Sequence, residues 1–163
     1  MNNNKSKINS RETTLNRLRS LSHLLDNAIP IPGTSYRIGI DPLLGLFPAA
    51  GDYLSAAFSA YIVIQAAQIG ASKATLSRMT LNIILDTLVG TIPMLGDLFD
   101  FSWKANTKNM ALLESHANSP DKTKKADGWF LGLLLIVLTL VVVVTTAVSV
   151  MILGFLLKII TSL

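Results

Sequence analysis

The chain has 163 residues; half are hydrophobic, 14 are Lys or Arg, 10 are Asp or Glu, and the net charge is +4. It has no cysteine, which excludes disulfides, thiolate metal sites and a cysteine nucleophile. Its two histidines, His23 and His116, give little material for a metal site or a serine–histidine pair. No phosphate-binding loop, nucleophile elbow or zinc-protease motif occurs. We therefore expect no enzyme, no catalytic residue, no cofactor and no metal.

The first residues read as a polar tail followed by an amphipathic helix. Residues 1–10 are rich in Asn, Ser and Lys and are predicted to be disordered. Residues 11–28 are predicted as a basic amphipathic helix, because Leu15, Leu18, Leu21 and Leu25 recur at helical spacing. Such a helix can lie on a membrane, but its apolar stripe more often packs against the rest of the domain, which we favour.

Residues 29–117 are predicted to form a helical domain. The prolines and the Pro-Gly pair in "IPIPGTSYRIGID" exclude a continuous helix there. Helices are expected over Tyr53–Ile69, from about Lys73 through Asp86, and over Leu98–Ser115. Between the first two, Gly70 is a plausible C-cap, and Ser72 can begin the next helix.

A twelve-residue segment of this domain occurs twice. "DPLLGLFPAAGD" from Asp41 returns 45 residues later as "DTLVGTIPMLGD" from Asp86, with six identities in twelve positions. An internal duplication explains this most economically, with repeats at about 34–70 and 79–116. Each repeat is expected to consist of a helix, a break and a second helix. The candidate motif residues are Asp41, Gly45, Pro48, Gly51 and Asp52, and their counterparts Asp86, Gly90, Pro93, Gly96 and Asp97.

These motif residues have a structural and a functional interpretation. Glycine and proline break the helices, and Asp52 and Asp97 are placed to N-cap the helices that follow. Asp41 followed by Pro42 also reads as a helix start, whereas Asp86 lies inside an apparent helix. The alternative is an ion or proton site built from carboxylates on helix breaks near a membrane. We favour the structural interpretation, since capping needs only one acid.

After a linker at 118–128, residues 129–158 are predicted as a transmembrane helix. No charged residue occurs from Gly128 to Leu157, a stretch of 30 residues, and about 20 suffice to cross a bilayer core. Trp129 and Lys158 flank it as interfacial residues. The positive-inside rule places residues 1–127 in the cytoplasm. The basic clusters on that side would attract anionic headgroups. Whether helices 53–69 and 74–90 also enter the bilayer stays open.

Two longer segments, "LDNAIPIPGTSYRIGIDPLLGLFPAAGD" and "NIILDTLVGTIPMLGDLFDFSWKANTKN", resemble the bacterial domain-of-unknown-function family 4112. The resemblance covers about Leu24–Leu113. It lies in Leu25–Asp26, Ile31–Thr34, Arg37, Gly39, Asp41, Gly45–Pro48, Gly51–Asp52, Asp97–Asp100 and Trp103–Asn109. It implies a small membrane-associated helical protein and supplies no catalytic residue.

The sequence thus predicts an all-α fold: a duplicated helix-break-helix domain with one C-terminal transmembrane helix. The expected function is a non-enzymatic scaffold or accessory subunit of a membrane assembly in a bacterial inner membrane. The alternative is a small ion- or proton-handling membrane protein that uses the repeated Asp residues. The expected partners are the lipid bilayer, including anionic headgroups, and other membrane proteins. Nucleic acid is not expected, because the basic tail has no interleaved aromatic residues. The sequence leaves the oligomeric state open.

Overall fold

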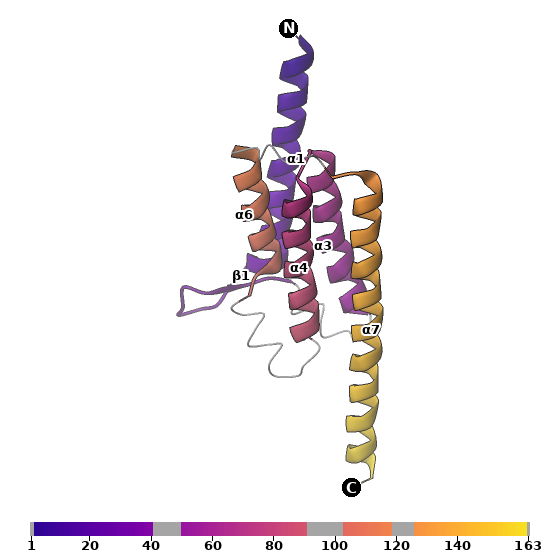
Figure 1. Ribbon diagram of the computed structural model, residues 1–163. Coiled ribbons are helices and arrows are strands. Elements are labelled where there is room, and N and C mark those ends of the chain that lie inside the picture. Colours follow the sequence, from indigo (N-terminus) through magenta and orange to yellow (C-terminus); the bar gives the residue numbers. More distant parts are fainter. Residues whose placement is uncertain (1, 41–49, 91–102, 119–125, 163) are drawn as a thin grey trace.

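The computed structural model describes residues 2–40, 50–90, 103–118 and 126–162. The elements, labelled as in Figure 1, are α1 (Asn2–Asn27), β1 (Ile29–Pro30), β2 (Arg37–Ile38), α3 (Ala50–Gln68), α4 (Lys73–Gly90), α6 (Ala105–Asn118) and α7 (Gly128–Thr161). The predicted all-α class is confirmed. The only departure among the described residues is a two-stranded antiparallel sheet that pairs Ile29 with Ile38 and Pro30 with Arg37.

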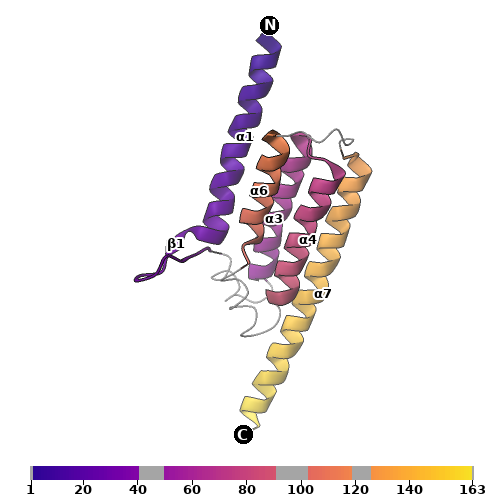
Figure 2. The ribbon, with the colours of Figure 1, turned by 60° about the vertical axis from the view of Figure 1, so that its left-hand side comes forward.

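The helices form an upright bundle (Figures 1 and 2). α4 packs against α6, α7 and α3, and α1 packs against α6. Two helices are longer than the bundle and project from opposite ends of it. The N-terminal part of α1 extends past one end, and the C-terminal part of α7 extends past the other, so the termini lie far apart (Figure 1).

The core lies where α1, α3, α4 and α6 meet. Its fully buried large side chains include Leu18, Leu25, Ile62, Leu76, Met79 and Leu113. Each such side chain contributes about 1.5–3 kcal/mol when it leaves water. Leu15 and Leu21 are partly buried against the same cluster. The leucine stripe of α1 therefore packs within the domain, as the favoured interpretation of its spacing predicted.

The turn between α3 and α4 confirms both of its predicted signals. Gly70 has φ +96°, a left-handed conformation that favours glycine after a helix. The amides of Gly70 and Ala71 donate back to the carbonyls of Ala67 and Ala66, which satisfies the last free acceptors of α3. At the start of α4, the Ser72 hydroxyl accepts from the Thr75 amide at 3.2 Å, as an N-cap does.

α1 begins much earlier than the sequence predicted. Residues 2–10, expected to be disordered, are helical and continuous with the packed part of α1. Once a helix is nucleated, each further residue adds one hydrogen bond for one residue fixed, so the packed leucine stripe supports an extension of polar residues. The hydroxyls of Thr13 and Thr14 also donate to the carbonyls of Asn9 and Ser10.

Two other helix starts differ from the prediction. α3 begins at Ala50, so Asp52 lies inside its first turn and the predicted N-cap position is wrong. α6 begins at Ala105, whereas a helix was expected from Leu98. Residues 98–102 lie outside the described residues, and Trp103 and Lys104 are not helical.

The two proposed repeats do not begin alike. The first repeat was expected to begin with a helix, and this is wrong: Arg37 and Ile38 form β2. Their counterparts at an offset of 45, Asn82 and Ile83, lie in α4. The Pro-Gly turn, with Gly33 at φ +79°, bends the first segment back on itself, and no such pair occurs in α4. The duplication itself stays a prediction.

α7 has two halves in different surroundings. Along its first half, Leu131, Leu134 and Leu138 pack on the core cluster, and Val142, Thr145 and Thr146 are also buried. The outer face of this first half is exposed, as at Ile136, which is 60% accessible. Along the second half no side chain is buried, with Met151 74% and Ile160 67% accessible. Among the described residues this is the one helix long and apolar enough to cross a membrane.

Candidate functional site

The most elaborate polar arrangement in the structure lies where α1 ends and α6 begins. We call it the polar junction: Asp26, Asn27, Arg37, Lys104, Asn106 and Thr107. These residues come from α1, β2 and the start of α6, which are up to 81 positions apart in the chain. All but Asn27 belong to the residues and ranges that carry the family resemblance.

Asp26 is the centre of the junction. Its residue is only 8% exposed, one carboxylate oxygen accepts from the Thr107 amide at 2.6 Å, and the other accepts from the Asn106 side chain at 3.0 Å. An acid from α1 therefore satisfies a free amide in the first turn of α6, where the helix dipole also favours negative charge. Asp26 caps α6 from a distant helix.

Burial raises the pKa of Asp26 above its ordinary value of 3.8. The hydrogen bonds from Asn106 and Thr107 and the nearby Lys104 ammonium oppose that rise but are weaker than the loss of solvation. Folded protein thus binds this proton more tightly than unfolded protein does. The contribution of Asp26 to stability is full below pH 3.8 and is lost as the pH rises through the raised pKa.

Replacing Asp26 with Asn is expected to lower the free energy of unfolding by about 1–3 kcal/mol at neutral pH. The new amide nitrogen must face either the Thr107 amide or the Asn106 amide, because both are donors. Denaturant titrations in detergent between about pH 4 and pH 7 should also show that the variant lacks the acidic dependence of the wild type. Asp127→Asn, at an exposed ion pair with Lys73, is the control and should change little. Identical pH profiles for Asp26→Asn and wild type would contradict this assignment.

The basic residues of the junction bind the end of α1. Lys104 Nζ donates to Asn27 Oδ1 and, at 2.8 Å, to the Arg37 carbonyl. Arg37 Nε donates to the Asn27 carbonyl at 2.8 Å. The carbonyls at a helix C-terminus carry partial negative charge and lack partners within the helix, so the Arg37 guanidinium matches them, while Lys104 joins the Asn27 side chain to β2. They fix the short sheet and the start of α6 against the same helix end.

Gly39 permits the closest backbone approach in this region. A Cβ built on Gly39 would lie 1.4 Å from the Leu25 carbonyl oxygen, which no side chain can occupy. The amide of the next residue, Ile40, donates to the Leu24 carbonyl at 3.2 Å. Glycine is therefore needed for β2 to run across the end of α1, and this contact positions Arg37.

A line of amides continues the junction into the bundle. Ser59 Oγ donates to Asn106 Oδ1 at 3.0 Å, and Asn82 Nδ2 donates to Asn109 Oδ1 at 2.9 Å. Asn106 and Asn109 are both fully buried on the inner face of α6, beside Met110 and Leu113. Buried amides with specific partners favour this rotation of α6 against α3 and α4, because another rotation would break both hydrogen bonds.

Most of the repeated motif residues lie outside the described residues. These are Asp41, Gly45, Pro48, Pro93, Gly96 and Asp97. Gly51 and Asp52 lie in the first turn of α3, and Gly90 is the last residue of α4. Asp86 lies inside α4, as expected, and is half-buried with an interaction of its own. The structure therefore does not test the four-carboxylate site. Among the described residues, no group of three or more His, Cys, Asp or Glu is placed to hold a metal ion.

The two predicted flanks of the apolar helix lie near its ends. Trp129 is in the first turn of α7, where its ring lies 6.1 Å from the Phe130 ring and 5.6 Å from Lys73 Nζ. Lys73 Nζ also pairs with Asp127 at 2.7 Å. Trp129 therefore joins α7 to the start of α4. Lys158 lies in the last turn of α7, where a cation is favourable to the helix dipole.

The sequence reasoning gave the junction residues no role of their own. One signal was present: Asn106 and Asn109 stand three residues apart on the same helix face as Met110 and Leu113. Asparagine on a buried helix face requires a partner, so this spacing indicates a buried polar contact. The identity of the partners, Ser59, Asp26 and Asn82, depends on the tertiary fold and could not be read from that spacing.

The chain is thus a small α-helical domain with a C-terminal helix suited to a membrane. Its helices form one bundle, and the polar junction joins α1 to α6. Residues 14–117 match the family model described as Domain of unknown function (DUF4112). That match covers more than half of the chain, so the chain belongs to this family. No curated protein and no solved structure gives a significant match.

Proposed function

We propose that this chain is a membrane-anchored protein that acts as a non-enzymatic scaffold or accessory subunit of an assembly in a bacterial inner membrane. α7 is its single span, and residues 1–127 face the cytoplasm. The observation that carries the proposal is the exposed second half of α7, where residues 147–161 project from the bundle with one cation, Lys158 (Figure 1). Exposed apolar side chains along a whole helix need lipid or a partner to cover them.

The length of α7 sets how deeply the bundle sits. Residues 147–158 span roughly 18 Å at 1.5 Å per residue, and a bilayer core is about 30 Å thick. With Lys158 at the far interface, about 12 Å of the bundle end lies within the hydrocarbon. The helix ends there carry exposed apolar side chains, namely Tyr53 and Leu54 on α3 and Leu85 and Leu88 on α4. Those side chains suit the hydrocarbon and its edge.

The polar junction supports a structural use of the cytoplasmic domain. Its side chains form hydrogen bonds with one another and with the backbone of α1 and α6, so they hold these two helices in a fixed arrangement. A rigid domain fixed on a bilayer presents constant surfaces to other chains. This is the property that a scaffold or accessory subunit requires.

Because the chain has no cysteine, single cysteines report its topology directly. Ser162→Cys at the end of α7 is expected to react with a membrane-impermeant maleimide added to intact spheroplasts. Ser20→Cys, on the exposed face of α1, is expected to react only after the membrane is permeabilised. Labelling is read by gel shift, and the cysteine-free wild type is the background control. Labelling of Ser20→Cys in intact spheroplasts would contradict the orientation.

The same membranes test the assembly. After gentle solubilisation at native expression levels, the chain is expected to co-elute with at least one other polypeptide. Recovery of a lone, monodisperse monomer would contradict a scaffold or accessory role while leaving the topology result intact.

A further inference from the structure

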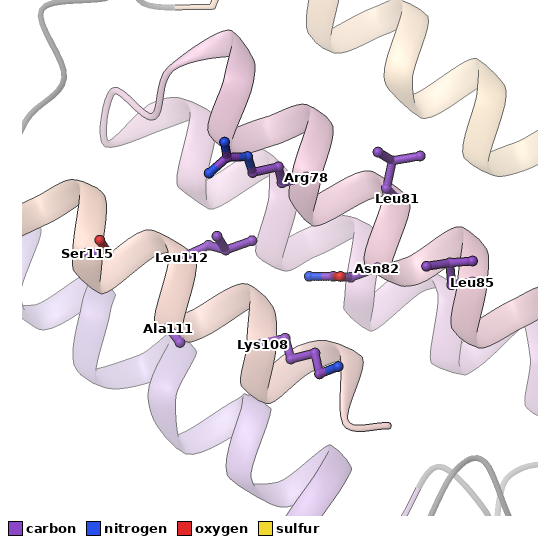
Figure 3. Close-up of a pocket in the computed structure, with 8 residues that line it drawn as sticks. All are labelled: Arg78, Leu81, Asn82, Leu85, Lys108, Ala111, Leu112 and Ser115. Carbon is purple, nitrogen blue, oxygen red and sulfur yellow. The ribbon is translucent and has the colours of Figure 1, made fainter. Parts of the chain in front are cut away.

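A groove of about 600 Å³ runs along the surface between α4 and α6 (Figure 3). Its floor is apolar and is formed by Leu81 and Leu85 of α4 and by Ala111 and Leu112 of α6. Leu81 is 56% and Leu85 is 42% exposed. None of the residues of the polar junction is among those that line the groove.

Two cations flank this floor. Arg78 lies toward the end of the groove where α6 ends, and Lys108 lies toward the end where α6 begins (Figure 3). Among the described residues that line the groove there is no acid. In the described part of the chain the ion pairs are Arg19–Glu114 and Lys73–Asp127, so Arg78 and Lys108 belong to neither. Lys108 Nζ lies 2.9 Å from the centre of the Trp103 ring, which holds this cation beside the groove.

If α7 anchors the chain as proposed, the groove also lies at the depth of the lipid headgroups and the upper acyl chains. If about 12 Å of the bundle end is in hydrocarbon, Asn82 stands near the edge of the bilayer core, since it is eight residues from the end of α4. Arg78 is four residues further, roughly 6 Å above that edge. The apolar floor thus begins in the acyl region, and Arg78 stands at the level of the headgroups.

We propose that this groove binds an anionic phospholipid. One acyl chain lies on Leu81, Leu85 and Leu112, Arg78 pairs with the phosphate, and Lys108 adds positive potential along the rim. Basic pockets beside apolar helix surfaces on the cytoplasmic side suit such headgroups. A second copy of the chain fits the groove less well. A twofold interface would bring Arg78 and Lys108 against the same cations of the partner, and the described lining residues include no acid to match them.

Native mass spectrometry of the full-length chain in mild detergent tests this inference. The protein is offered equal amounts of phosphatidylglycerol and phosphatidylcholine with identical acyl chains. Wild type is expected to retain phosphatidylglycerol preferentially. Arg78→Gln should reduce that preference about fivefold, and Lys108→Gln should reduce it in the same direction. Arg17→Gln removes the same charge from the exposed face of α1 and should leave the preference unchanged.

A groove-filling variant separates a seated lipid from charge attraction alone. Ala111→Phe keeps every charge and occupies the floor, so it should lower the retention of both lipids. Equal retention of the two lipids by wild type, or an unchanged preference in Arg78→Gln, would overturn the proposal. So would a doubled mass or a second protein that Ala111→Phe displaces, because either would show that a protein occupies the groove. Carbonate extraction of the same membranes reports the anchor separately: a chain that stays in the pellet but shows no lipid preference refutes only the groove.

Discussion

Truncation after Ala126 is expected to destroy the cooperative fold of the remaining domain. Although α7 reads as a membrane anchor, its first half supplies Leu131, Leu134 and Leu138 to the bundle. Removing three partly or fully buried leucines withdraws roughly 5 kcal/mol or more of hydrophobic stabilisation. That is comparable with the whole net stability of a typical domain, about 5–15 kcal/mol.

Truncation after Thr146 is the matched control, because it keeps the packed half of α7 and removes only the exposed half. Both products and the full chain are compared by circular dichroism during thermal unfolding in the same detergent. The longer product should unfold in one sharp transition and the shorter one gradually. A 126-residue product that melts as sharply as the full chain, at the same temperature, would show that α7 is an anchor alone.

Replacing Gly39 with alanine is expected to lower the free energy of unfolding by at least about 3 kcal/mol. The new Cβ would lie 1.4 Å from the Leu25 carbonyl oxygen, and backbone atoms cannot rotate aside as a side chain can. The short sheet must then separate from the end of α1. That movement breaks the hydrogen bond from the Ile40 amide to the Leu24 carbonyl and withdraws Arg37 from the carbonyl of Asn27.

Two other glycine-to-alanine variants are the controls for Gly39→Ala in the same thermal unfolding assay. Gly132→Ala places its Cβ in open space within α7 and should raise the free energy of unfolding by about 0.5–1 kcal/mol, because alanine is the better helix former. Gly33→Ala meets no atom either, but φ is +79°, so a cost of about 1 kcal/mol from backbone strain alone is expected. If Gly39→Ala were no worse than Gly33→Ala, the close approach to α1 would not be a real constraint on the fold.

The parts of the fold that could be predicted from the sequence depend on local signals. Gly70 and Ser72 mark the α3–α4 turn through backbone conformation and capping, which act over a few residues. The leucines of α1 predict its buried face through helical spacing. The lack of charge along α7 indicates a helix suited to lipid. The resemblance to the family, inferred from short motifs, agrees with the family model that matches residues 14–117.

The parts that could not be predicted depend on contacts between distant segments. Nothing near Asp26 in the chain indicates that it caps a helix 80 residues later. The need for glycine at position 39 arises only when β2 crosses the end of α1. Apolar side chains suit lipid and protein equally, so the sequence could not show that the first half of α7 packs on the bundle. Polar residues at the start of α1 have no apolar face of their own, and only the packed stripe behind them makes their helix favourable.

The opposite directions of α1 and α7 have a consequence for salt dependence. The bundle between the two projections is about as tall as α3, whose 19 residues rise roughly 28 Å. In the proposed orientation about 12 Å of this height lies in hydrocarbon. The remaining height of roughly 16 Å, together with the projecting part of α1, separates Lys5 and Lys7 from the bilayer core. Physiological salt screens charges over about 8 Å, so these lysines attract anionic lipid weakly, contrary to the sequence interpretation of the basic N-terminus. These lysines face the cytoplasm. Binding of the chain to the bilayer therefore depends on hydrocarbon contact, and we expect it to change little with ionic strength.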